Sequence, residues 1–173
     1  MKHLFCVIIL LFGIFTSAFA EDYPDGTVVV WENGNMRSIV QRQTGSNKTH
    51  AGIVLYEGTQ AYVYEAAKPD VHRYTIEQYE RILDQYHKKF PDLGVYFLKP
   101  RTPYTTAQLQ AMKKYANANL GRAFGVRSYM TGKPQVTIHC CEYIGNILYC
   151  SGRYHNLGPK ETPKTIFDKA SKL

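Results

Sequence analysis

The chain has 173 residues, 20% of them charged, and a formal net charge of +7. The positive charge is spread along the sequence without a block of five or six like charges. A modest positive charge suits anionic surroundings such as cell wall or lipid head groups, but many other proteins carry a similar charge. The sequence contains no zinc-finger spacing, glycine-rich phosphate loop or RNA-binding motif, which argues against a nucleic-acid partner.

Residues 1–20 have the pattern of a secretory signal peptide. Lys2 and His3 precede an apolar run over residues 4–15, and the segment ends in small residues at Ala18 and Ala20. A membrane span needs about 20 apolar residues, so this shorter run favours cleavage after Ala20 over a retained anchor. We therefore expect a periplasmic or secreted protein with no integral membrane span after cleavage.

Residues 21–173 suit a single domain, since one domain holds about 100–200 residues. Removal of Lys2 with the signal peptide lowers the formal charge from +7 to +6. Cys140, Cys141 and Cys150 remain, and an odd count leaves at least one thiol unpaired unless it pairs with another chain. If this region is helical, Cys141 and Cys150 lie about 13.5 Å apart along the axis, beyond disulfide reach. No structural disulfide framework is expected.

An opening strand, a short helix and a hairpin are predicted in the first part of the domain. β-branched residues mark the opening strand, and the alternating Tyr62 and Tyr64 mark the second strand of the hairpin. The predicted elements are a strand at 27–31, a helix at 36–43, and hairpin strands at 51–56 and 60–66 with their turn at 57–59. His50 lies at the entrance of the hairpin and Glu65 near its exit.

Two helices in the middle of the chain are predicted to begin with capping boxes, Thr75 with Gln78 and Thr105 with Gln108. Apolar residues recur at helical spacing after each box, and Gly121 is expected to end the second helix. The predicted elements are helix 76–88, strand 94–98, helix 106–120, an irregular stretch at 121–135, a strand at 136–139, a helix from 140 that ends by 152, and a short helix from 165. This order predicts an α+β fold, with an antiparallel sheet or small barrel flanked by helices.

Cys140, His50 and Glu65 are the candidate catalytic residues. A thiol attacks a carbonyl only as thiolate, and a free cysteine with a pKa of about 8.5 is mostly protonated at neutral pH. His50 could take the proton, and Glu65, at the other end of the hairpin, could hold the second ring nitrogen. At the start of its predicted helix, Cys140 would gain from the helix dipole and from unpaired backbone N–H groups, which could also bind an oxyanion.

Rival assignments for these roles stay open. Cys141 is the rival nucleophile, because successive helix residues point about 100° apart and only one of the two thiols can face His50. His139 is the rival base, although neighbouring residues of a strand point to opposite faces. Zinc binding by His139, Cys140, Cys141 and His50 is conceivable, but adjacent cysteines chelate poorly and no C-x-x-C is present. Glu142 is expected to act in local capping.

Structural interpretations compete with each of these roles. A buried cysteine is usually a small hydrophobe, and a single histidine or glutamate is more often a satisfied or solvated side chain. The remaining histidines lie in polar, irregular or surface-like settings and are given no role: His72, His87 and His155.

Five short motifs together resemble the permuted papain-like amidases of the YaeF/YiiX type, relatives of the NlpC/P60 cell-wall hydrolases. Residues 25–29 (DGTVV) look like the opening strand of that family, and residues 49–54 (THAGIV) are similar to its S-H-x-G-hydrophobic motif. Residues 62–66 (YVYEA) resemble its V-x-E-A strand, residues 120–124 (LGRAF) its L-G-K-P-Y, and residues 140–144 (CCEYI) its C-S-E-L-V. The five occur in the family's order.

The resemblance implies a papain-like fold, with Cys140 as nucleophile, His50 as base and Glu65 as the third member. It implies an exported cysteine hydrolase that cleaves amide or ester bonds through an acyl-thioester, on a cell-envelope peptide or lipid and without a cofactor. Two alternatives remain, a non-catalytic envelope binding module of the same fold and a lipid acyltransferase.

Overall fold

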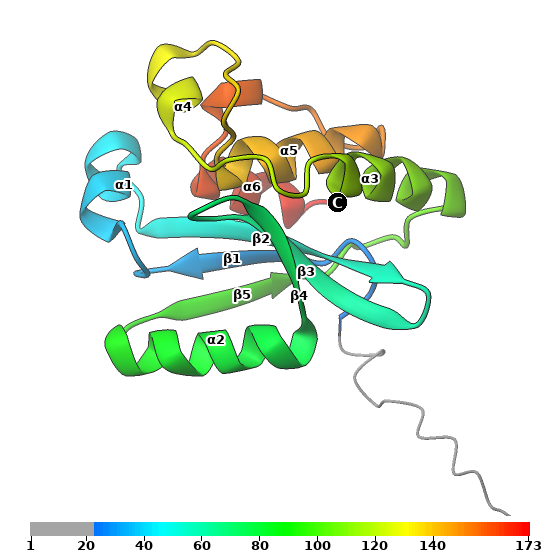
Figure 1. Cartoon of the computed structure of the whole chain (residues 1–173), viewed down its shortest axis with the longest axis horizontal. Coiled ribbons are helices and arrows are strands. Elements are labelled where there is room, and N and C mark those ends of the chain that lie inside the picture. Colours follow the sequence, from blue (N-terminus) through cyan, green and yellow to red (C-terminus); the bar gives the residue numbers. More distant parts are fainter. Residues whose placement is uncertain (1–22) are drawn as a thin grey trace, which may run out of the picture.

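A five-stranded antiparallel sheet with strand order β4-β3-β2-β1-β5 forms the centre of the protein (Figure 1). The computed structural model describes residues 23–173, so the predicted signal peptide at 1–20 lies outside the described residues. The strands are β1 Val28–Glu32, β2 Lys48–Glu57, β3 Gln60–Ala66, β4 Val71–Thr75 and β5 Gly94–Leu98.

Helices cover both faces of the sheet, with α2 on one face and α3, α5 and α6 on the other (Figure 1). The helices are α1 Arg37–Thr44, α2 Ile76–Lys89, α3 Thr106–Ala118, α4 Arg127–Thr131, α5 Cys140–Cys150, the 3-10 helix η2 Gly158–Lys160 and α6 Pro163–Ala170. None of the helices within residues 23–173 combines the length and the apolar character that crossing a bilayer requires. The predicted α+β architecture is confirmed, and the sheet is open rather than a barrel.

Each face of the sheet has its own apolar core. The core on the α3, α5 and α6 side centres on α5, in which every residue from Cys140 to Gly145 is buried, together with Ile147 and Leu148. The core on the other side packs Tyr79 and Leu83 of α2 against the sheet. Burial of a side chain as large as Ile or Leu contributes about 1.5–3 kcal/mol, so the buried Ile144, Ile147 and Leu148 help to hold α5 on the sheet.

Side-chain caps fix where the helices begin. Both predicted capping boxes are present: Thr75 with Gln78 starts α2, and Thr105 with Gln108 starts α3. A third box, Thr162 with Thr165, starts α6 at Pro163, two residues earlier than the last helix was expected to begin. The reason is that Pro163 suits the first turn of a helix, where its missing N–H costs nothing.

Backbone hydrogen bonds to the start of β4 fix the path of the chain between α3 and α5. Val71 N–H donates to Arg122 O at 2.8 Å, and Phe124 N–H donates to Pro69 O at 2.9 Å. Ile138 N–H then donates to Ala123 O at 3.0 Å, so the residues before α5 lie against those that follow α3. These bonds place the N-terminus of α5 beside the end of the sheet where β3 leads into β4.

The sequence prediction was incomplete in this connection. Strand β4 was not predicted, because its polar residues His72 and Arg73 hide the alternation of a strand. The stretch expected to be irregular contains the short helix α4, and the predicted strand at 136–139 is reduced to a single bridge between Phe124 and Ile138.

The close approach at Gly125 provides a test of this arrangement. A Cβ added at Gly125 would lie 2.5 Å from Thr137 Oγ1 and 2.8 Å from Thr137 Cβ, so the two chain segments would have to separate. We expect Gly125→Ala to lower the free energy of unfolding by about 1–3 kcal/mol, measured by denaturant titration. In a Thr137→Gly background the same change should cost much less, and an equal cost in both backgrounds would contradict this account.

Candidate active site

His50 and Glu65 meet across the β2–β3 hairpin. Gly52 is paired with Glu65, and His50, two residues before Gly52, lies on the same face of the sheet. His50 Nε2 is 2.8 Å from Glu65 Oε2, and both side chains are largely shielded from solvent. The hairpin therefore brings two of the three predicted residues into direct contact.

Trp31 closes one side of this pair. It is the cross-strand neighbour of His50 on β1, and the two rings meet edge to face with centroids 5.0 Å apart. Trp31 Nε1–H donates to the hydroxyl of Tyr79 on α2 at 2.8 Å, which fixes the indole. The His50 ring thus lies against a buried aromatic wall, where few rotamers are open to it.

Cys140 is the first residue of α5, and its sulfur is within hydrogen-bonding reach of the His50 ring. Since Glu65 engages Nε2 of that ring, Nδ1 is the nitrogen left for the sulfur. The structure therefore brings Cys140, His50 and Glu65 together. The N–H groups of Cys140 and Cys141 lie in the first turn of α5, where a helix provides no internal acceptor.

The pKa values favour a thiolate beside an imidazolium. The pKa of Cys140 is well below its ordinary value, because the hydrogen bond from Cys141 and the contacts with His139 and His50 outweigh the opposing effect of burial. Burial lowers the pKa of His50, but the charge of Glu65 and the Cys140 sulfur outweigh it and raise the pKa to about 10. Burial likewise opposes ionisation of Glu65, yet His50 and His72 lower its pKa to about 2.

Cys141 has the opposite character. Only 1% of its surface is exposed, and its Sγ lies 3.6 Å from that of Cys140. Burial and the neighbouring Cys140 raise the pKa of Cys141 well above its ordinary value, so it remains a thiol that donates to the Cys140 sulfur. This difference favours Cys140 over Cys141 as the nucleophile.

His139 lies closer to the thiol than a strand would allow. It is the N-cap of α5, and its Nδ1 accepts the Glu142 N–H at 3.3 Å, which turns the ring back over the first turn of the helix. The second nitrogen, Nε2, is 3.1 Å from Pro159 O and donates to it. His139 was expected to point away from Cys140, and this expectation was wrong because residue 139 belongs to the helix cap rather than to a strand. Burial lowers the pKa of His139, but its hydrogen bond with the Cys140 sulfur, together with its other polar contacts, outweighs burial and raises that pKa, so His139 stays a rival partner for the thiolate.

His72 was given no role from the sequence, yet it contacts the site. It is the cross-strand neighbour of Glu65 on β4, and its Nε2 lies 3.2 Å from Glu65 Oε1 while Nδ1 lies 3.4 Å from Asp70 Oδ1. The hydrogen bond to Glu65 raises the pKa of His72, despite partial burial. Each oxygen of Glu65 thus faces one imidazole. Residues 67–70 (AKPD) are typical of a turn, and a strand after this turn would place His72 opposite Glu65. This sequence signal was missed.

Glu142 anchors α5 rather than capping it through its side chain. Its Oε2 accepts the hydroxyl of Ser128 at 2.6 Å, and both residues are buried. The bond ties α4 to the first turn of α5. The expected local capping is instead done by the His139 ring.

Three possible metal ligands also gather here. The donor atoms of His139, Cys140 and Cys141 all lie within 4.8 Å of one another. Sulfur and imidazole nitrogen suit zinc and other soft divalent ions. Ligation by His139, however, would require it to release either the Glu142 N–H that it caps or Pro159 O. The sulfur atoms fit a metal ion better than the histidine does.

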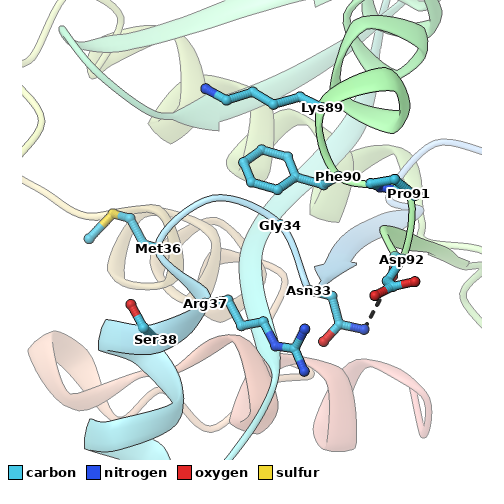
Figure 2. A pocket seen from close by; sticks show the side chains of 9 residues that line it. All are labelled: Asn33, Gly34, Met36, Arg37, Ser38, Lys89, Phe90, Pro91 and Asp92. Atoms are coloured by element: carbon cyan, nitrogen blue, oxygen red, sulfur yellow. Dashed lines mark hydrogen bonds between the residues drawn. The ribbon is translucent and has the colours of Figure 1, made fainter.

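A separate hollow lies at the loop between β1 and α1, next to the C-terminus of α2 (Figure 2). It measures about 420 Å³ and is lined by residues that include Asn33, Arg37, Lys89 and Asp92. Asn33 donates from Nδ2 to Asp92 O at 3.2 Å across it. The candidate catalytic residues are not part of its lining.

Comparisons with known proteins establish the fold. No family model and no curated protein sequence matches the chain. Among solved structures, it is similar to the crystal structure of the metalloprotein YiiX from Escherichia coli O157:H7, with a TM-score of 0.56 and 15% sequence identity. The match covers 72% of this chain and 64% of YiiX, so the chain spans less than two thirds of that structure. The predicted α+β, papain-like fold of the YiiX type is supported, and at this identity the likeness extends to the fold alone.

The charge of Glu65 should control ionisation of the thiol. We expect Glu65→Gln to raise the pKa of Cys140 by about one to two units, because loss of the carboxylate weakens the His50 imidazolium that stabilises the thiolate. Thiolate absorbance, titrated against pH with Cys140→Ala as the blank, measures the shift. His72→Gln keeps a donor for Glu65 and should shift the Cys140 pKa far less. Equal shifts in both variants would contradict the view that Glu65 acts on Cys140 through His50 while His72 acts only on Glu65.

Proposed function

We propose that the protein is an exported cysteine hydrolase that cleaves amide or ester bonds through an acyl-thioester intermediate. The observation that carries the proposal is the convergence of Cys140, His50 and Glu65 from three separate elements on one buried site. Their pKa shifts support the proposal because they favour the reactive ionic form of each group. The YiiX-like fold is compatible with it.

In the first step, the Cys140 thiolate attacks the substrate carbonyl carbon, and the carbonyl electrons move to oxygen. The oxyanion is bound by the N–H groups in the first turn of α5, each good donor contributing about 3 kcal/mol. His50 then donates its Nδ1 proton to the departing amine or alcohol, and the carbon–nitrogen or carbon–oxygen bond breaks. Glu65 keeps Nε2 protonated throughout and orients the ring.

In the second step, neutral His50 removes a proton from water, and the resulting hydroxide attacks the thioester. The carbon–sulfur bond breaks, a carboxylic acid leaves, and the thiolate–imidazolium pair is restored. Transfer to an alcohol or amine in place of water would give an acyltransferase by the same steps. No cofactor takes part in either route.

The proposed substrate is an amide or ester of the cell envelope, in a peptide or a lipid. This part of the proposal depends on the signal-peptide pattern at residues 1–20, which predicts a periplasmic or secreted location. It also depends on the resemblance to the YaeF/YiiX and NlpC/P60 amidases. A non-catalytic binding module of the same fold would have no need of a buried carboxylate–imidazole–thiol chain.

Metal binding is the second candidate function. The cluster of His139, Cys140 and Cys141 favours it, and the similar structure, YiiX, is described as a metalloprotein. A metal ion held by Cys140 would occupy the sulfur that the hydrolase needs. Elemental analysis of the purified protein tests this candidate: one tightly bound zinc per chain, together with protection of both thiols from alkylation, would favour it over catalysis.

Selective labelling tests the hydrolase. At pH 6 we expect iodoacetamide to modify Cys140 about 100-fold faster than Cys150, because burial raises the pKa of Cys150 while that of Cys140 is lowered. Peptide mass spectrometry gives the two rates. An activity-based acyl probe should label the wild type, Cys141→Ala and Cys150→Ala, but not Cys140→Ala. Labelling that disappears only in Cys141→Ala would overturn the assignment of the nucleophile.

A further inference from the structure

The chain between α3 and α5 exposes aliphatic side chains beside the proposed nucleophile. We call residues 120–136, which include α4, the approach segment. Val126 is 39% exposed, Met130 76% and Val136 90%. In Figure 1, α4 and the loop after it project at the outer edge of the helical layer, away from the sheet. Only a few residues separate this segment from Cys140.

These side chains are exposed although the segment is well anchored. The Arg122 side chain donates to Gln135 O at 2.7 Å and to Val136 O at 2.8 Å, and Ser128 is bound to Glu142. Its inward positions are occupied by Ser128 and by Phe124, which packs against the core that contains α5. Because the backbone is held at both ends, the three aliphatic side chains do not belong to either core.

The charge of this region has a single sign. Residues 93–141 contain no Asp or Glu, and their charged residues are Lys99, Arg101, Lys113, Lys114, Arg122, Arg127 and Lys133. Arg127 and Lys133 are exposed within the approach segment. At its base, exposed Lys160 donates from Nζ to Tyr129 O at 2.8 Å. Glu142 is the first acidic residue after the approach segment in the sequence, and its carboxylate is buried against Ser128.

We propose that the approach segment docks on the surface of a bilayer that contains anionic lipids. Val126, Met130 and Val136 enter the boundary between head groups and acyl chains, while Arg127 and Lys133 pair with lipid phosphates. Exposed aliphatic residues interspersed with cations are the chemistry of interfacial membrane binding. Resting on the proposed function, this inference narrows the substrate to the acyl group of a lipid amide or ester.

The geometry links docking to the site. Residues 137–139 connect the approach segment directly to Cys140, and the Ser128–Glu142 bond fixes α4 on the first turn of the same helix. A bilayer that contacts Met130 and Val136 therefore lies close to the N-terminus of α5. The acyl chain of a lipid would have a short path from the bilayer to the thiol, without the lipid leaving the interface.

Vesicle co-sedimentation tests docking on the chain without residues 1–20, the predicted signal peptide. We expect binding to vesicles of phosphatidylglycerol and phosphatidylcholine, and much weaker binding to phosphatidylcholine alone. Arg127→Gln combined with Lys133→Gln should weaken binding about 25-fold, because each cation near an anionic surface contributes about fivefold. Met130→Ser combined with Val136→Ser should weaken it about tenfold, because the apolar anchors are lost.

Matched control variants stand elsewhere on the surface. Tyr149, 61% exposed at the far end of α5, is changed to Ser, and the exposed Lys88 of α2, on the opposite side of the sheet, is changed to Gln. Both should bind vesicles like the wild type. Unfolding midpoints show that each variant is folded. Equal vesicle binding by all folded variants, or no binding by the wild type, would overturn the docking proposal.

The same assay separates docking from catalysis. Cys140→Ala should bind the vesicles as the wild type does, because it leaves the approach segment unchanged. Vesicle binding without acyl labelling of Cys140 would sustain docking and count against the hydrolase. Labelling without vesicle binding would sustain the hydrolase and overturn docking, which would leave the exposed aliphatic residues for a protein partner.

Discussion

The buried chain of charges from Glu65 through His50 to Cys140 is the interaction on which the site depends. Burial alone would neutralise each of the three groups, since a charge loses its hydration in the interior. Each stays ionised because the next lies in contact with it: Glu65 is 2.8 Å from the ring that faces the sulfur. An ion pair of this kind tolerates little displacement. The fold must therefore hold β2, β3 and the start of α5 in fixed relative positions.

Four features meet this requirement. Backbone pairing of the hairpin fixes His50 relative to Glu65, and Trp31 blocks other orientations of the ring. The apolar surface of α5 presses the helix on the sheet, while the bridges at Ala123 and Phe124 determine where along the sheet it begins. Apolar packing is not directional, so the hydrogen bonds of the segment before α5 supply the register that packing alone cannot.

Local rules predicted the parts of the site that depend on neighbouring residues. The β2–β3 hairpin could be predicted from alternation and its turn, and it placed His50 near Glu65 in advance. The start of α5 at Cys140 was likewise predicted from the apolar run that follows. Contacts set by distant segments could not be predicted: β4 brings His72 to Glu65, and Pro159 O accepts from the His139 ring. The local cap by His139 was also missed, because residue 139 was expected in a strand. The approach of Cys140 to His50 was the long-range contact that spacing left undetermined.

Burial of the thiol also limits what can reach it. Cys140 is 9% exposed, so a substrate must give up most of its hydration before its carbonyl meets the sulfur. For a peptide, the polar groups beside the scissile bond would lose water and need new partners, at about 1–3 kcal/mol for each one left unpaired. An acyl chain carries no such groups, and in a bilayer its apolar part has already left water. The exposed aliphatic residues and cations just before Cys140 would bring the thiol close to a bilayer surface. A lipid acyl chain could then reach the thiol without the cost of desolvating polar groups, which favours lipid over peptide as the source of the acyl group.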